Sequence, residues 1–317
     1  MQFEPRYFNP ASVGEPQTDG SIACELADAN GRKTLYVYDR SVVFAINVAL
    51  AAGRPLLLAG EPGSGKTSVA RNAARILEWP YYEQTISSRT QASDLIWEFD
   101  SLRRLNDAHD PKRNIRDDAY YVKPGKLWWA LAPQTARTRG IGQIEEGDAV
   151  AEPVETVPGD DPKHAVVLLD EIDKADPDVP NDLLEVLDRG SFRVNDKPIE
   201  KARESLLIVL TTNGERELPG AFQRRCVTFR FPSPTQQWFT QVANRWHGEA
   251  QSALHSAIAA KLMDARTEAE RDNIRRPGTA EYLDAVSACH KLGIDPSSDE
   301  WKDLESCVFR KQTTLDP

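Results

Sequence analysis

Gly60-Glu61-Pro62-Gly63-Ser64-Gly65-Lys66-Thr67 decides the fold class of this 317-residue chain. The stretch fits the pattern G-x-x-x-x-G-K-[ST], in which a glycine-rich turn points successive backbone N–H groups at phosphate oxygens. Residues 54–59 before it predict a buried strand, and residues 68–77 after it predict a helix. Because the helix N-terminus adds positive potential at the same place, this context favours a phosphate-binding loop over a chance match in a glycine-rich turn.

Each position of this loop has an expected role in binding a nucleotide. Gly60, Gly63 and Gly65 let the backbone approach the phosphates closely. Lys66 is expected to bind the β- and γ-phosphates and to take part in catalysis, and Thr67 is expected to offer its hydroxyl to Mg²⁺. The remaining nucleotide-binding positions of the predicted site are Glu61, Pro62, Ser64 and Ser68.

A second motif follows an apolar run further along the chain. Residues 165–169 are continuously apolar, as expected for a central parallel strand covered on both faces, and Asp170 and Glu171 come next. Because ligands of open α/β sheets bind at the carboxyl ends of strands, we expect Asp170 to hold Mg²⁺ through water. Glu171 is expected to polarise the attacking water. A helix N-cap pair is the alternative, and we assign such a structural cap to Asp173.

Two further polar positions are candidates for the same site. Asn213 follows the predicted strand 205–210 and is expected to orient water against the γ-phosphate, with a turn residue before Gly214 as the alternative. Arg224 and Arg225, supplied to a neighbouring subunit, could stabilise the charge that develops during phosphoryl transfer. Two solvated or salt-bridged surface arginines are the alternative.

The hydrophobic pattern predicts an α/β fold with a doubly wound parallel sheet. Apparent strands alternate with helices, and they lie at residues 34–38, 54–59, 81–86, 165–169 and 205–210. A further helix is expected to begin after the N-cap residue Asp39, and residues 191–200 predict a hairpin with an Asn195-Asp196 turn. We therefore expect an N-terminal extension (1–34), a nucleotide-binding core (35–233) and a small helical lid subdomain (234–317).

Two segments of the predicted core differ from the rest in composition. Within residues 98–130, basic side chains precede an aromatic cluster; the basic residues are Arg103, Arg104, Lys112, Arg113 and Arg116, and the aromatic ones are Tyr120, Tyr121, Trp128 and Trp129. This segment either grips an extended polymer or packs its aromatic side chains into the core beside a solvated basic face. Residues 140–163 are acidic and poor in aromatics, which predicts a mobile loop.

The overall composition limits the class of protein. The formal net charge of −10 argues against duplex DNA as the main partner. No apolar run approaches the length of a membrane span, and the N-terminus lacks a signal-peptide pattern. The four cysteines and five histidines show no metal-ligand spacing, so we expect reduced cysteines and a cytoplasmic location.

The order of these motifs resembles the AAA+ ATPases. The resemblance rests on residues 60–67, residues 166–171, Asn213 and the pair Arg224-Arg225, and it covers about residues 35–290. The 191–200 hairpin is similar to the pre-sensor insertion, and residues 98–130 are similar to the helix-2 insertion. Residues 187–194 and Leu218-Pro219 resemble the MoxR-type branch of this family.

This resemblance implies a Mg²⁺-dependent ATPase that forms a ring, usually of six subunits, with ATP at each interface. Arg225 falls where the family places its arginine finger, and Arg224 replaces an acid often found there. Such ATPases commonly remodel or assemble client proteins, often with a von Willebrand A-domain partner, and no membrane partner is implied. The usual Gly-x-x-Pro-Arg pattern of the lid is replaced by Arg275-Arg276-Pro277-Gly278-Thr279, where Arg276 could reach the γ-phosphate or Pro277 could start a helix.

Two other functions stay open at the level of sequence. The basic and aromatic segment 98–130 also suits a nucleic-acid-stimulated NTPase motor of a restriction or defence type, which the net charge of −10 opposes. The third alternative is an NTP-gated scaffold with slow turnover. The sequence does not name a client, and no base-reading motif separates ATP from GTP.

Overall fold

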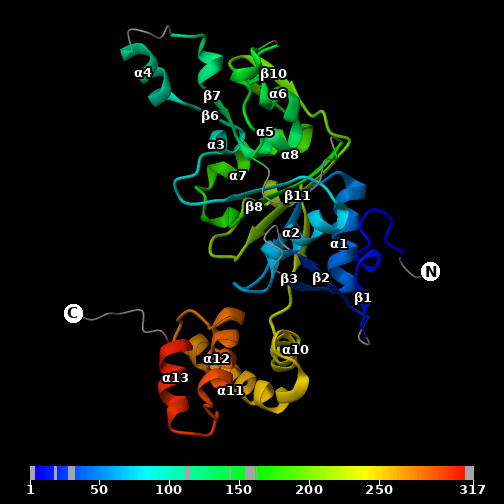
Figure 1. Ribbon diagram of the computed structural model, residues 1–317, viewed down its shortest axis with the longest axis vertical. Helices are drawn as coiled ribbons and strands as arrows, with labels where there is room; N and C mark the ends of the chain where they lie inside the picture. Colours follow the sequence, from blue (N-terminus) through cyan, green and yellow to red (C-terminus); the bar gives the residue numbers. More distant parts are fainter. Residues whose placement is uncertain are drawn as a thin grey trace. The chain divides into compact units, whose positions relative to one another are not determined.

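The computed structural model describes residues 4–17, 20–27, 33–110, 115–142, 144–153, 161 and 163–310. The chain divides into two compact units, which we describe separately (Figure 1). The first unit comprises Met1–Ala59 and Lys66–Arg230. The second comprises Gly60–Gly65 and Phe231–Pro317. The contacts of the glycine-rich loop therefore assign it to the same unit as the C-terminal helices.

A five-stranded sheet forms the centre of the first unit. Its strands lie in the order β12 (Val227–Arg230), β4 (Leu56–Ala59), β11 (Ser205–Thr212), β8 (His164–Asp170) and β5 (Tyr81–Thr85). All neighbouring strands are parallel. Their carboxyl ends therefore lie at one edge of the sheet, and it is this edge that carries ligands in open α/β folds.

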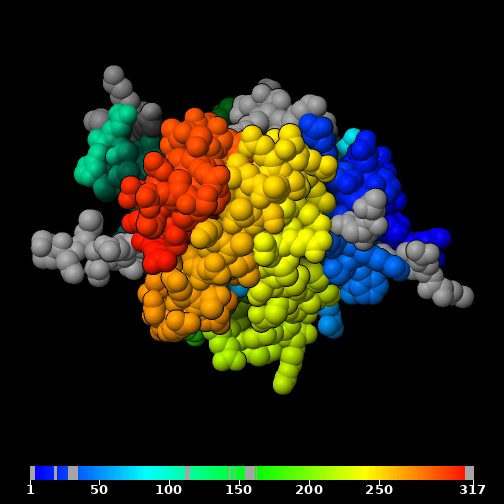
Figure 2. Space-filling model, turned by 90° about the horizontal axis from the view of Figure 1, so that it is seen from below, coloured from blue at the N-terminus to red at the C-terminus, as the bar shows by residue number. Residues whose placement is uncertain are grey.

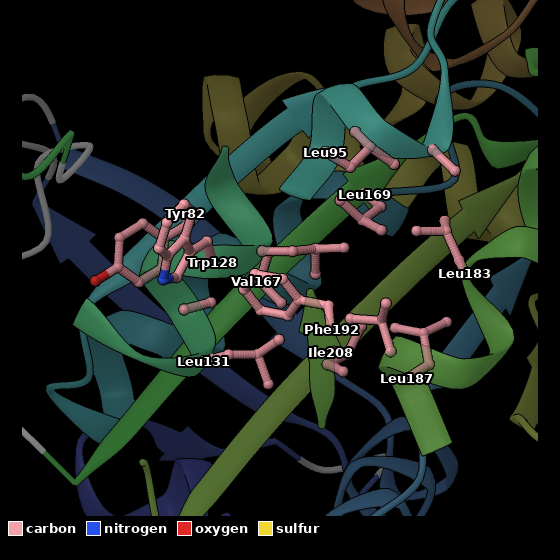
Figure 3. Packing of buried hydrophobic residues seen from close by; sticks show 14 of the residues in the cluster. Tyr82, Leu95, Trp128, Leu131, Val167, Leu169, Leu183, Leu187, Phe192 and Ile208 are labelled. Atoms are coloured by element: carbon pink, nitrogen blue, oxygen red, sulfur yellow. The ribbon is translucent and has the colours of Figure 1, made fainter. Parts of the chain in front are cut away.

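The central strands are apolar on both faces because helices cover both faces. In β8, Val167 and Leu169 point into one buried cluster with Trp128, Leu131 and other side chains (Figure 3). The alternate residues Val166 and Leu168 are also buried and face the opposite side. The first face is covered by α5 (Lys126–Leu131), α6 (Pro133–Arg137), α7 (Asp178–Asp182), α8 (Leu184–Arg189) and α9 (Gly220–Gln223), and the second by α1 (Arg40–Ala52) and α2 (Lys66–Leu77). The predicted doubly wound α/β fold is confirmed.

The predicted hairpin forms a small sheet of its own, whereas the predicted strand 34–38 belongs to a separate antiparallel sheet and not to the central one. The hairpin β9 (Ser191–Val194)–β10 (Lys197–Glu200) turns at Asn195 and Asp196, whose φ angles of 46° and 63° are those that a two-residue hairpin turn requires. Strand β3 (Lys33–Tyr38) pairs with β2 (Ile22–Ala27), which pairs with β1 (Glu15–Pro16). Asp39 stands at the N-cap of α1, as predicted.

The part of the segment 98–130 that precedes α5 projects from the core as a ribbon that carries a helix, whereas α5 packs on the central sheet (Figure 1). Strand β6 (Trp97–Phe99) follows α3 (Ala92–Ile96) and pairs antiparallel with β7 (Val122–Pro124); α4 (Ser101–His109) and the 3₁₀ turn η2 (Asp118–Tyr121) lie between them. The side chains of Tyr121, Trp128 and Trp129 are buried, whereas Arg103 and Arg104 are exposed. Core packing of these aromatic side chains is therefore the correct alternative, while Lys112 and Arg113 lie outside the described residues.

The described part of the acidic stretch 140–163 is anchored to the core. Asp148 pairs with Arg116 at 2.6 Å, and Glu152 accepts a hydrogen bond from the Tyr82 hydroxyl. Val150 packs against the buried cluster of the sheet. The expectation of a mobile loop is thus wrong for residues 144–153, because their carboxylates find cationic and phenolic partners. Residues 143, 154–160 and 162 lie outside the described residues.

Up to residue 310, the second unit contains four α-helices around a core of their own. These are α10 (Gln236–His247), α11 (Ser252–Arg271), α12 (Thr279–Leu292) and α13 (Glu300–Val308), and they lie side by side in Figure 2, coloured yellow to red. Phe239, Ile258, Leu262, Tyr282 and Val286 form the centre of this core. The predicted C-terminal helices are confirmed. None of the helices in the described ranges is long and apolar enough to cross a lipid bilayer.

Candidate nucleotide site

The glycine-rich loop has backbone angles that only glycine adopts without strain. β4 ends at Ala59 and α2 begins at Lys66, so the loop is the predicted strand-to-helix turn. The φ angles of Gly63 and Gly65 are 79° and 88°. A Cβ atom at Gly60 would lie 2.9 Å from the Cβ atom of Phe231, which is closer than real contacts allow. These glycines are therefore needed for the shape of the turn.

One polar atom of this loop fits a ligand. The Ser64 hydroxyl oxygen is buried and has no hydrogen-bond partner within the part of the chain that the structure describes. A buried polar atom of this kind is normally satisfied, and phosphate oxygens would satisfy it. The other predicted positions of the loop differ in exposure: Pro62 is exposed, while Glu61 and the helical Ser68 are half-buried.

The first unit brings a hydroxyl and a carboxylate together at the sheet edge. The Thr67 Oγ1 atom lies 3.0 Å from Oδ2 and 3.2 Å from Oδ1 of Asp170. The Thr211 hydroxyl of β11 also donates to Oδ1 of Asp170. Lys66, one residue before Thr67, is buried with only 6% of its surface exposed. Hydroxyl and carboxylate oxygens are the hard ligands that Mg²⁺ prefers, so the donor set fits the predicted metal.

Glu171 is held in an unusual backbone conformation. Its φ of 62° is left-handed, which is uncommon for a residue other than glycine, and its N–H donates to Thr211 Oγ1 at 2.8 Å. The Lys174 Nζ atom donates to Oε2 of Glu171 at 2.7 Å, and the Asn213 Nδ2 atom lies 3.4 Å from Oε1. Glu171 precedes a short 3₁₀ turn, but within the described residues its side chain makes no cap hydrogen bond. Glu171 therefore occupies the N-cap position of this turn without capping it through its side chain.

Asp173 is not the helix cap that we expected. Its Oδ2 atom accepts hydrogen bonds from the backbone N–H groups of Asn213, at 3.1 Å, and of Glu215, at 2.9 Å. The residue is buried, with 2% of its surface exposed. The Asp173 carboxylate thus binds the backbone of a loop that lies 40 residues away in the sequence. In this way it fixes the backbone that carries the Asn213 side-chain amide. A local pattern of acids before a helix could not reveal this role.

The two candidate arginines lie at the end of α9 and are exposed. The guanidinium of Arg225 pairs with the carboxylate of Asp188, in α8, and Arg225 Nη1 donates to the Ala221 carbonyl at 3.4 Å. Among the described residues, Arg224 has no ion-pair partner. Within a single chain, Arg225 is a salt-bridged surface arginine. A role as an arginine finger would require a second chain.

The second unit places Arg276 against the glycine-rich loop. Its Nη1 atom lies 3.7 Å from Oε1 of Glu61, and its Nη2 atom lies 3.2 Å from Oε1 of Glu270. α12 begins at Thr279, with Gly278 as its N-cap and a hydrogen bond from the Gly278 N–H to Glu281. The expectation that Pro277 starts the helix at its first position is therefore wrong by two residues, because the capping box of Glu281 sets the start.

Four residues near the site escaped the sequence reasoning. They are Thr211, which holds Asp170 and Glu171; Lys174, which pairs with Glu171; Asp188, which pairs with Arg225; and Arg266, which pairs with Glu61. Two of them carry a signal in hindsight. Thr211 ends an apolar strand next to Asn213, and Arg266 continues the i, i+4 series of Ile258 and Leu262, where an apolar core residue is expected.

Comparison with known proteins gives a family and one solved structure. The chain is similar to the structure of a putative ATPase from Cytophaga hutchinsonii ATCC 33406, at 15% sequence identity, over 78% of this chain and 67% of that chain, with a TM-score of 0.41. Residues 55–226, which are more than half of the chain, match the family described as AAA domain (dynein-related subfamily). These residues include the whole of β4, the glycine-rich loop and every polar residue of the site from Lys66 to Arg225. The chain belongs to the dynein-related subfamily of AAA domains and is an ATPase.

Proposed function

We propose that this chain binds ATP with Mg²⁺ at the carboxyl edge of its central sheet and hydrolyses it as one subunit of a ring. The proposal further assigns the chain to the MoxR-type branch, whose members remodel or assemble a partner protein complex. One observation carries the hydrolytic part most directly. Asp170 and Glu171 are adjacent carboxylates with different neighbours. Asp170 lies next to the Thr67 hydroxyl, and Glu171 lies next to the Asn213 amide.

These different neighbours suit a division of labour between metal and nucleophile. When bound, Mg²⁺ would neutralise phosphate charge, and Thr67 and Asp170 are the residues that would hold it. Thr211 donates to Asp170 and accepts from the Glu171 N–H, so a single hydroxyl orients both acids. The Glu171 carboxylate would accept the proton of the attacking water. Asn213 and Lys174 fix the two oxygens of that carboxylate.

The ring part of the proposal concerns Arg225. An arginine finger that is supplied in trans belongs to the neighbouring subunit. It stabilises the phosphoryl group that is being transferred. Arg225 is 45% exposed and is oriented by Asp188, which suits an arginine presented to a neighbouring copy. Arg224, beside it, is exposed as well and would lie at the same interface. The six-membered ring remains part of the proposal, together with its client and a von Willebrand A-domain partner.

The structure favours a protein client over a nucleic acid as the partner. A nucleic-acid motor would need accessible aromatic side chains for base stacking, whereas Tyr121, Trp128 and Trp129 are buried. On α4, Arg103 and Arg104 are exposed, and Arg104 pairs with Asp118 at 2.9 Å. An NTP-gated scaffold would share the nucleotide site and differ in turnover, so a kinetic measurement separates it from a remodelling ATPase.

The test combines turnover, assembly and capture. The purified chain should hydrolyse ATP only with Mg²⁺ and should form larger assemblies in saturating ATP, measured by light scattering. The Glu171→Gln variant should bind ATP without turnover and retain the same protein client in ATP but not in ADP. Glu185→Gln, an exposed substitution in α8, is the matched control and should behave as wild type. Full turnover by Glu171→Gln, or nucleic-acid-stimulated turnover that disappears in high salt, would contradict the proposal.

A further inference from the structure

A buried arginine of the C-terminal helices contacts the glycine-rich loop. Arg266 lies on the core side of α11, with 5% of its surface exposed. Its Nη1 atom donates to the Pro277 carbonyl at 2.7 Å, and its Nη2 atom donates to the Glu61 carboxylate. The guanidinium carbon also lies 5.8 Å from the centre of the Phe239 ring. A buried cation without an anionic partner is strongly unfavourable. The burial of Arg266 therefore depends on its pairing with Glu61.

Glu61 is the acidic residue of the glycine-rich loop, and this loop is expected to bind anionic phosphate groups. Burial would raise the pKa of this carboxyl, but the hydrogen bond and the charge of Arg266 hold the pKa below its ordinary value, with smaller contributions from Ser233 and Arg276. Ser233 donates to Oε1 at 3.1 Å, and Arg276 lies 3.7 Å from the same oxygen. Glu61 is therefore an ionised carboxylate within a phosphate-binding turn. An unpaired negative charge there would repel the phosphates.

Backbone contacts join the same loop to the start of α12. The Thr279 hydroxyl donates to the Gly63 carbonyl at 2.8 Å. At Gly278 an added Cβ atom would lie 3.2 Å from the Pro62 carbonyl oxygen, so the two backbones are closely apposed. These contacts and the Arg266–Glu61 pair all lie within the second unit. The loop that continues into Lys66 thus has its side-chain and backbone partners among the C-terminal helices.

We propose that Arg266 is a positioning residue for nucleotide binding, which acts through Glu61. It neutralises the carboxylate and holds it away from the phosphate position, so that the turn from Gly60 to Gly65 takes the shape that receives the phosphates. Arg276, the arginine expected to reach the γ-phosphate, also contacts this carboxylate. This inference rests on the proposed binding of ATP at the loop. Because coupling is reciprocal, bound nucleotide should in turn stabilise the helices that carry Arg266.

The decisive measurement is the dissociation constant of a fluorescent ATP analogue with Mg²⁺, for the full chain and its variants. Arg266→Gln removes the guanidinium that contributes most to the neutralisation of the Glu61 carboxylate and should weaken binding about tenfold. Glu61→Gln removes the charge but keeps an acceptor, so affinity should stay within about threefold of wild type. The double variant should bind more tightly than Arg266→Gln alone, because the repulsive charge is gone. A merely structural role of Arg266 would make the double variant as weak as the single one, or weaker.

Arg276→Gln tests the same idea at a more exposed position, should Arg266→Gln not fold. It should weaken binding by a few-fold in the wild-type background and have no effect in the Glu61→Gln background. The matched control is Arg275→Gln, the neighbouring exposed arginine, which pairs with Glu281 and should leave the affinity unchanged. Unchanged affinity in both arginine variants, while the wild type binds ATP, overturns this inference alone. A wild-type chain that binds no ATP overturns the proposed function with it.

Discussion

The side-chain amide of Asn213, which follows β11, lies 3.4 Å from the carboxylate of Glu171, which follows β8. The two residues are 42 positions apart in the chain, and they meet because β8 and β11 are parallel neighbours whose carboxyl ends coincide. The Asp173 carboxylate fixes the Asn213 backbone from the same side. The proposed base and the amide beside it are thus positioned by neighbouring strands of the sheet.

The Glu171 carboxylate should be essential for turnover and dispensable for binding. Glu171→Gln keeps the hydrogen bond with Asn213 but cannot accept a proton, so we expect turnover to fall by about 10²–10⁴-fold. Nucleotide affinity should change little. Steady-state kinetics measures the turnover, and titration with an ATP analogue measures the affinity, with Glu185→Gln as the control. Turnover of Glu171→Gln at the wild-type rate would show that Glu171 is not the base.

The Asp173 carboxylate should stabilise the fold as well as the site. Asp173→Ala removes the buried carboxylate that accepts from two partly buried backbone N–H groups, at a cost of about 1–3 kcal/mol in the free energy of unfolding. Denaturant unfolding measures this loss. Asp182→Ala, an exposed position in α7, should cost little. Equal stability of the two variants would show that the Asp173 bonds are not formed in solution.

Removal of the Thr67 hydroxyl should affect the use of Mg²⁺. Thr67→Val keeps the shape of the side chain but removes the oxygen that faces Asp170, so a higher Mg²⁺ concentration should be needed for half-maximal turnover. Ser64→Ala is an informative companion, since its hydroxyl has no partner among the described residues and should matter only when phosphate is bound. A Mg²⁺ dependence identical to that of the wild type would contradict the role of Thr67.

The C-terminal helices should lose stability in acid. His247, His255 and His290 meet there: the Nε2 atoms of His255 and His290 lie 2.9 Å apart, and the His247 ring centre is 5.0 Å from that of His290. Burial lowers the pKa of His247 and His255, and the neighbouring histidines lower it further, with Lys291 acting on His247. The unfolded chain therefore binds protons more readily, so stability should be complete above the ordinary value of 6.5 and should fall as the pH drops below it.

Thermal unfolding of the chain across this pH range tests the histidine prediction. His290→Gln should reduce the pH dependence, because it removes the neighbour that lowers the pKa of both His247 and His255. His109→Gln, an exposed histidine of α4, is the matched control and should leave the dependence intact. A midpoint that does not change between neutral and mildly acidic pH would contradict the prediction.

The sequence predicted those parts of the molecule that depend on local pattern. The glycine-rich turn, the apolar runs of β8 and β11 and the turn at Asn195 each follow from backbone angles or periodicity that neighbouring residues impose. It also placed Asp170, Glu171 and Asn213 at one edge, because the carboxyl ends of parallel strands coincide.

The remainder depends on contacts between residues far apart in the chain. Asp173 accepts from a loop 40 residues away, and Arg266 reaches a carboxylate 205 residues away. The local pattern at Asp173 predicted a helix cap instead, and no role was predicted for Arg266 from the sequence. Likewise, the burial of Trp128 and Trp129 follows from packing against β5 and β8, which their own sequence neighbourhood does not reveal.

The most direct test of a shared active site mixes two variants that are each inactive alone. Arg225→Ala should bind ATP yet turn over about 10³–10⁵-fold more slowly, and Glu171→Gln lacks the base. In a mixed assembly, an intact Glu171 from one chain meets an intact Arg225 from its neighbour, so turnover should reappear on mixing and depend on the ratio of the two variants. Normal turnover by Arg225→Ala alone, or a mixture no more active than its components, would contradict an arginine supplied by the adjacent subunit.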